Sequence, residues 1–120
     1  MATILLVEDT PANQALARKL LEAAGHRVLS ADTATDGIAL ARDELPDLVL
    51  LDLGLPDMNG WDALTAIRGD DRAAGLRVIA FTADAMLGDR ERALAAGFDG
   101  YLSKPIEYAT FVATVAGYLA

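Results

Sequence analysis

The sequence of 120 residues contains no cysteine. This absence excludes disulfide bonds and thiolate metal sites, and it is compatible with a reducing, cytoplasmic environment. No apolar run approaches the roughly 18 residues that a membrane-spanning helix needs. The N-terminal segment MATILLVED lacks the basic region, the long apolar stretch and the cleavage site of a signal peptide. We therefore expect a cytoplasmic protein.

Basic residues are scarce, since 10 lysines and arginines stand against 18 aspartates and glutamates and give a net charge of −8. This balance disfavours direct binding to nucleic acid or to an anionic membrane surface. An acidic surface is most simply explained by solubility. The length is that of one ordinary domain, and no linker, repeat or low-complexity segment divides it. We therefore predict a single domain over residues 1–120.

Short aliphatic runs alternate with amphipathic stretches along the chain. The aliphatic runs predict strands at residues 3–7, 27–31, 48–51, 77–81 and 100–103. Helices are expected from Pro11 to a stop at Gly25, over 34–45 with Pro46 as the stop, over 61–68, up to about residue 96, and over 107–119. This alternation predicts an α/β fold with a doubly wound parallel sheet covered by helices on both faces. A half-Rossmann fold is disfavoured because EDTPAN, after the first strand, contains no glycine.

The stretch DLVLLDLGLP, residues 47–56, ends a buried strand on the carboxylate of Asp52. Burying a charge is costly unless something compensates it. In open parallel sheets, ligands bind outside the carboxyl ends of the strands. Polar side chains gather at these ends: Glu8 and Asp9 after the first strand, Asp52 on the third, Thr82 on the fourth and Lys104 after the fifth. Each alone is more often structural, but their joint placement favours a functional site.

A divalent cation relieves the repulsion between such carboxylates. Mg²⁺ prefers oxygen ligands in octahedral geometry, with a few protein ligands completed by water and phosphate. Asp9, Asp52 and the Gly54 carbonyl can each supply one oxygen, with Glu8 acting through a water molecule. The Lys104 ammonium can neutralise remaining charge, and the Thr82 hydroxyl can hydrogen-bond a phosphoryl oxygen. The pattern predicts a site that places phosphate on a carboxylate.

Four sequence blocks carry a family resemblance over the whole chain: ILLVED at 4–9, LVLLDLGLPDMNG at 48–60, AFTADA at 80–85 and GYLSKP at 100–105. The chain resembles the receiver domains of two-component response regulators. The resemblance implies a flavodoxin-like sheet of strand order 2-1-3-4-5 and Asp52 as the phosphoacceptor. It also implies Mg²⁺ bound by Asp9, Asp52 and the Gly54 carbonyl with Glu8 assisting, and a phosphoryl group bound by Thr82 and Lys104.

The resemblance further implies a two-state switch. We therefore expect Thr82 to move toward the phosphoryl group and Tyr101, three positions before the lysine, to fill the vacated space. The face formed by the fourth helix, fifth strand and fifth helix is expected to change as a result. By the same resemblance, the expected phosphodonor is a phosphohistidine on a histidine kinase or a histidine phosphotransfer protein. Its expected contacts are Asn13, Gln14, Ala17, Pro105 and Ile106, whereas Leu16 and Leu20 are expected in the core. We expect a monomer or weak dimer that catalyses only its own phosphorylation and dephosphorylation.

Several alternatives stay open. The chain is either a free-standing regulator that signals by binding proteins or the receiver of a hybrid histidine kinase that passes phosphate to a phosphotransfer domain. A phosphatase with an aspartyl-phosphate intermediate, similar to the haloacid dehalogenase family, ranks lower because that family places a second aspartate where this chain has Gly54. A pseudo-receiver that only binds partners also ranks lower, because the acidic pair, the acceptor and the lysine are all present.

Overall fold

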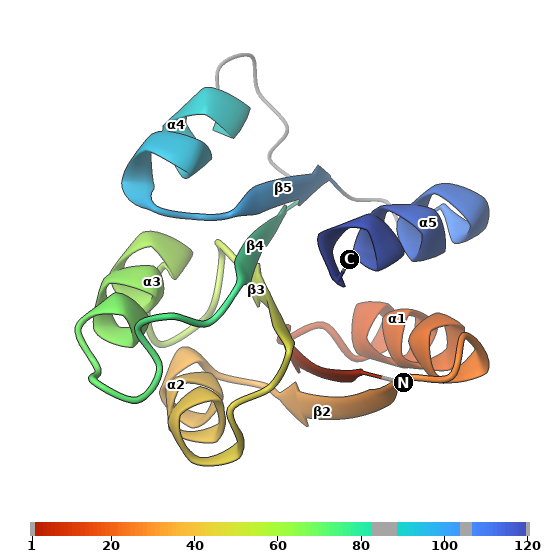
Figure 1. The fold of residues 1–120 in the computed structure, drawn as a ribbon, viewed down its shortest axis with the longest axis horizontal. Helices are drawn as coiled ribbons and strands as arrows, with labels where there is room; N and C mark the ends of the chain where they lie inside the picture. Colours follow the sequence, from red (N-terminus) through yellow and green to blue (C-terminus); the bar gives the residue numbers. More distant parts are fainter. Residues whose placement is uncertain (1, 83–88, 104–106, 120) are drawn as a thin grey trace.

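The structure, a computed structural model, describes residues 2–82, 89–103 and 107–119. Its centre is a five-stranded parallel sheet in the order β2-β1-β3-β4-β5 (Figure 1). The strands are β1 (Thr3–Val7), β2 (Arg27–Ala31), β3 (Leu48–Asp52), β4 (Val78–Thr82) and β5 (Gly100–Ser103). The helices are α1 (Pro11–Ala23), α2 (Ala34–Glu44), α3 (Gly60–Arg68), α4 (Asp89–Ala96) and α5 (Tyr108–Leu119). The predicted fold class and strand order are confirmed.

Helices cover both faces of the sheet, with α1 and α5 on one face and α2, α3 and α4 on the other (Figure 1). Successive side chains of a strand point to opposite faces, so each buried strand contributes to two separate cores. In β3, Leu48 and Leu50 pack with the residues of α1 and α5, whereas Val49 and Leu51 pack with those of α2, α3 and α4. This two-sided burial explains why the strands are uniformly aliphatic.

The predicted starts of α1 and α2 are correct, but their ends differ by one or two residues. Pro11 is the first residue of α1, and Thr10 occupies the N-cap position without a capping bond from its side chain. Gly25 has a φ of 94°, in the left-handed region that ends a helix, so α1 stops shortly before it. α2 stops before Leu45, which has a φ of 46° and precedes Pro46. The proline ring disfavours the helical conformation of the residue before it, here Leu45, which explains why α2 ends one residue earlier than predicted.

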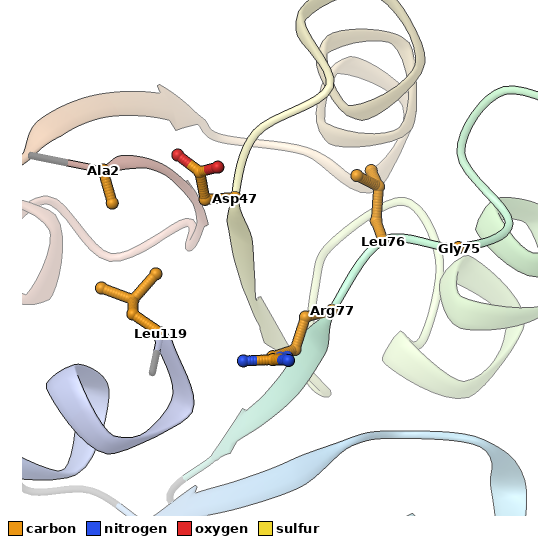
Figure 2. A pocket seen from close by; sticks show the side chains of 6 residues that line it. All are labelled: Ala2, Asp47, Gly75, Leu76, Arg77 and Leu119. Atoms are coloured by element: carbon orange, nitrogen blue, oxygen red, sulfur yellow. The ribbon is translucent and has the colours of Figure 1, made fainter.

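A hollow of about 460 Å³ lies at the amino ends of β1, β3 and β4 (Figure 2). The two charged side chains that line it both bind backbone atoms. The Asp47 carboxylate accepts a hydrogen bond of 2.7 Å from the Thr3 N–H, and the Arg77 guanidinium donates to the Tyr118 carbonyl. The first bond joins the start of β1 to the residue before β3, and the second joins the residue before β4 to the end of α5. The chemistry expected from the sequence lies at the opposite edge of the sheet.

None of the helices in the described part of the chain is long and apolar enough to cross a membrane.

Candidate metal centre at the carboxyl edge of the sheet

Three carboxylates meet where β1 and β3 end. One oxygen each from Glu8, Asp9 and Asp52 lies within 4.8 Å of the others. The register explains this proximity, because Val7 pairs with Leu51 and the acidic residues follow directly in both strands. Glu8 is fully buried and Asp52 is only 6% exposed, whereas Asp9 is exposed. Two of the three charges are therefore held below the protein surface.

Backbone and side-chain donors fix the orientation of two of these carboxylates. A Glu8 carboxylate oxygen accepts hydrogen bonds of 3.2 Å from the Thr10 N–H and 3.4 Å from the Asn13 side-chain amide. The Gly54 N–H donates to Asp52 Oδ1 at 3.0 Å. The strand ends therefore hold the acidic groups in a preformed arrangement.

The chemistry of this donor set fits Mg²⁺. The ion is hard, prefers carboxylate oxygens and usually keeps several water ligands, so a cluster with one exposed member leaves room for water. A dication also offsets the charge of two buried carboxylates whose mutual repulsion opposes folding. Glu8, Asp9 and Asp52 would hold such an ion. The contribution of the Gly54 carbonyl stays a prediction, although the bond from its N–H places this residue beside Asp52.

The predicted switch residues lie on the neighbouring strands. Thr82 ends β4 and is 3% exposed, and because Asp52 pairs with Phe81, Thr82 lies one position beyond the level of Asp52. Tyr101 in β5 pairs with Ala80, is half-buried, and donates its N–H to the Tyr118 hydroxyl at 3.3 Å. Thr82 pairs with Ser103, so Tyr101 lies on the neighbouring strand two positions before the partner of Thr82.

Three of the predicted residues, Lys104, Pro105 and Ile106, lie outside the described residues. The predicted phosphoryl contact of Lys104 and the predicted docking contacts of Pro105 and Ile106 stay predictions.

The predicted docking residues of α1 are only partly placed as expected. Asn13 and Gln14 are half-buried, and the Gln14 amide donates to the Glu8 carbonyl and, at 2.6 Å, to the Asp32 carboxylate. The expectation that Ala17 contacts a partner is wrong, because its side chain is fully buried.

The assignment of Leu16 to the core is also wrong, since Leu16 is 41% exposed, whereas the burial expected for Leu20 is confirmed. Ala17 lies three and four residues before the buried Leu20 and Leu21, which is the spacing of one helix face. Leu16 lies one residue earlier and is turned away from that face.

The loop between β3 and α3 makes three contacts that were not predicted from the sequence. Gly60 approaches β3 so closely that a Cβ atom there would lie 2.6 Å from Leu53 Cα and 2.8 Å from the Asp52 carbonyl oxygen. The Asn59 side chain caps α3 by accepting from the Asp62 N–H at 2.9 Å. Asp57 binds the first turn of α2. The turn residues of PDMNG marked a loop, but nothing in the sequence identified the partner of Asp57.

Residues 4–116 match the response regulator receiver domain family, the class of protein to which the fold and the acidic site also point. The chain belongs to this family, whose general role is phosphorylation-dependent signalling.

Among curated relatives, the chain is 38% identical to the polar-differentiation response regulator DivK of Brucella anthropi, over 98% of this chain and 95% of that protein. Two solved structures show the same fold. The receiver domain of a sensor histidine kinase from Pseudomonas aeruginosa, with a magnesium ion coordinated in its active-site cleft, has a TM-score of 0.88 and 34% identity over 98% of this chain and 97% of the other. A CheY-like receiver domain protein from Methanospirillum hungatei has a TM-score of 0.86 and 32% identity over 99% and 94%.

Proposed function

We propose that this chain is a phosphorylation-dependent signalling switch in which Asp52 accepts a phosphoryl group from a phosphohistidine. The observation that carries the proposal is the cluster of Glu8, Asp9 and Asp52, whose oxygens lie within 4.8 Å of one another at the end of two core strands. The magnesium ion in the related Pseudomonas aeruginosa receiver supports the proposal that this cluster takes Mg²⁺.

The residues of the site fit an in-line transfer of phosphate. A carboxylate oxygen of Asp52 attacks phosphorus as the bond to the donor histidine nitrogen breaks, so an acyl phosphate forms. The donor ring carries a proton on its other nitrogen and therefore leaves as neutral imidazole. The Gly54 N–H bond to Asp52 Oδ1 orients the nucleophile. When bound, Mg²⁺ supplies charge stabilisation for the transferred group. Thr82 and Lys104 are proposed to bind the phosphoryl oxygens.

We propose that the chain catalyses only its own phosphorylation and dephosphorylation. The proposed chemistry transfers a phosphoryl group to the chain and later to water, and no external substrate is turned over. The proposed donors are a histidine kinase or a histidine phosphotransfer protein. Two roles stay open. The similarity to a response regulator supports a regulator that signals by binding proteins. The similarity to the receiver of a sensor kinase supports a hybrid-kinase receiver that passes phosphate to a phosphotransfer domain.

Nuclear magnetic resonance of Thr82 and Tyr101 tests the switch. With excess acyl phosphate and Mg²⁺ together, we expect the resonances of both residues to shift, because the new dianionic group gives Thr82 a partner and biases the equilibrium between two states. Neither reagent alone should produce this pattern. The Asp52→Asn variant should not respond, and an identical response in that variant would contradict the proposal.

Lys104→Ala separates phosphorylation from the switch. We expect this variant to keep Mg²⁺ binding and to lose the Tyr101 shift, because the ammonium group couples the phosphoryl group to the β5 end. A Tyr101 shift like that of the wild type would remove Lys104 from the proposed mechanism.

A further inference from the structure

The carboxylate of Asp57 fastens the β3–α3 loop, residues 53–59, to the start of α2. Asp57 Oδ1 accepts a hydrogen bond of 2.8 Å from the Ala34 N–H. Asp57 Oδ2 accepts from the Thr35 N–H at 3.0 Å and from the Thr35 hydroxyl at 2.7 Å. A single side chain thus receives three hydrogen bonds from a segment more than 20 residues earlier in the sequence.

These bonds complete the N-terminus of α2. The first N–H groups of a helix have no acceptor within the helix. Thr33 is the N-cap and accepts from the Asp36 N–H at 3.2 Å, whereas Asp57 accepts from Ala34 and Thr35, the first two helical residues. The negative charge of Asp57 also interacts favourably with the helix dipole at this end. Asp57 therefore binds N–H groups at the start of α2 that have no acceptor within the helix.

The loop itself is a closed unit whose other end touches the acidic cluster. Gly54 forms an isolated bridge with Asn59, and the Gly60 N–H donates to the Leu53 carbonyl at 2.9 Å. The Gly54 N–H also donates to Asp52 Oδ1. Asp57 lies three residues after Gly54 within this hydrogen-bonded unit, so a loop displaced from α2 would also displace the segment that holds Gly54.

The Asp57 carboxylate is ionised at neutral pH. The hydrogen bond from the Thr35 hydroxyl, followed by those from the Ala34 and Thr35 N–H groups, lowers the pKa of Asp57 from 3.8 to about 2. The side chain is exposed to solvent, so these directed bonds, and not burial, keep it in place.

We propose that Asp57 is a positioning residue for the metal centre: by holding the β3–α3 loop against α2, it keeps the Gly54 carbonyl where it can bind Mg²⁺ beside Asp9 and Asp52. This inference rests on the proposed function, because it requires that the acidic cluster takes Mg²⁺. Mg²⁺ demands near-ideal octahedral geometry, so a loose ligand weakens binding. Loss of residues that orient metal ligands typically weakens metal affinity by about 10- to 100-fold.

The test is a Mg²⁺ titration of the full chain followed by the amide resonances of Asp9, Asp52 and Gly54. We expect Asp57→Ala to bind Mg²⁺ about 10-fold more weakly than the wild type. Thr35→Val removes one of the three bonds without changing the net charge and should weaken binding by a smaller factor. Asp36→Asn is the matched control, because it removes an exposed charge from the same first turn of α2 and keeps all three bonds that Asp57 accepts. It should bind Mg²⁺ like the wild type.

Each outcome bears on a different claim. Wild-type affinity in both Asp57→Ala and Thr35→Val would overturn the positioning role, as would equal weakening in Asp36→Asn, which would attribute the effect to charge alone. Absence of Mg²⁺ binding in the wild type would instead overturn the proposed function. Urea unfolding of the metal-free variants separates positioning from stability, because a purely structural role lowers the unfolding midpoint and leaves the Mg²⁺ affinity of the folded protein unchanged. If Asp57→Ala does not fold, Thr35→Val alone decides, and unchanged affinity there overturns the inference.

Discussion

At the scale of single residues, the site contains two carboxylates at buried positions, where an uncompensated charge is unfavourable. Glu8 and Asp52 are almost completely buried, yet donors from Thr10, Asn13 and Gly54 orient them. A buried charge costs less when it is hydrogen-bonded and close to an opposite charge. The strand ends hold these groups rigidly, and a bound cation would offset their repulsion. This explains why a core strand can end on an aspartate.

Residues 16 and 17 allow a direct test of the α1 orientation. Ala17→Asp places a charge in the core and should lower the free energy of unfolding by about 3 kcal/mol. Leu16→Asp places the same charge on the exposed side of the same helix and should cost less than about 1 kcal/mol. Urea unfolding of the two variants measures the difference. Equal destabilisation would show that α1 is rotated relative to the structure.

At the scale of elements, the β3–α3 loop binds the N-termini of two helices. Asn59 is the N-cap of α3, and Asp57 accepts hydrogen bonds from the first N–H groups of α2. The close approach of Gly60 to the backbone of β3 explains why this position has no side chain. The geometry of the loop is therefore coupled to both helices as well as to Asp52.

The Asp57 attachment predicts a pH dependence of stability. Because the folded-state pKa of Asp57 is about 2 and the ordinary value is 3.8, the ionised carboxylate stabilises the folded chain at neutral pH. This contribution is complete above the ordinary pKa and is lost as the pH falls through the folded-state value. Wild type should therefore be more stable than Asp57→Asn at neutral pH. The difference should shrink between pH 3.8 and about 2.

Urea unfolding of both proteins across this range measures the effect. A difference in stability that stays constant down to the lower pH would show that the Asp57 charge is not coupled to folding.

Much of this arrangement could be predicted from the sequence, because strand ends in a parallel sheet converge. The aliphatic runs predict all five strands, and the polar residues at their carboxyl ends include the clustered carboxylates of Glu8, Asp9 and Asp52 as well as Thr82 at the end of β4. The contact of Asp57 with Thr35 could not be predicted, because it joins two loops through side-chain directions that periodicity does not encode. The exposure of Leu16 and the burial of Ala17 could not be predicted with certainty, because Leu16 and Ala17 lie four and three residues before Leu20 and both spacings fit one helix face.

At the scale of the whole molecule, the two edges of the sheet have different roles. Asp47 and Arg77 lie at the amino edge (Figure 2). Their charged side chains bind backbone groups of Thr3 and Tyr118 and join distant parts of the chain. At the carboxyl edge, the acidic groups of Glu8, Asp9 and Asp52 cluster where β1 and β3 end, the side of the sheet at which ligands bind in folds of this type. The rigid two-sided core between them holds the cluster in place. Among the described residues, the carboxylates that fit a metal ion therefore lie at one edge of the sheet, and the charged side chains that bind backbone groups of distant segments lie at the other.

The most direct test of the central claim is the intact mass of the protein after incubation with Mg²⁺ and a small acyl-phosphate donor. We predict a single phosphoryl adduct that disappears when Mg²⁺ is chelated and in the Asp52→Asn variant. Asp47→Asn, which alters a carboxylate at the opposite edge of the sheet, should be phosphorylated like the wild type. An adduct that persists in Asp52→Asn, or that forms equally well without Mg²⁺, would contradict the account.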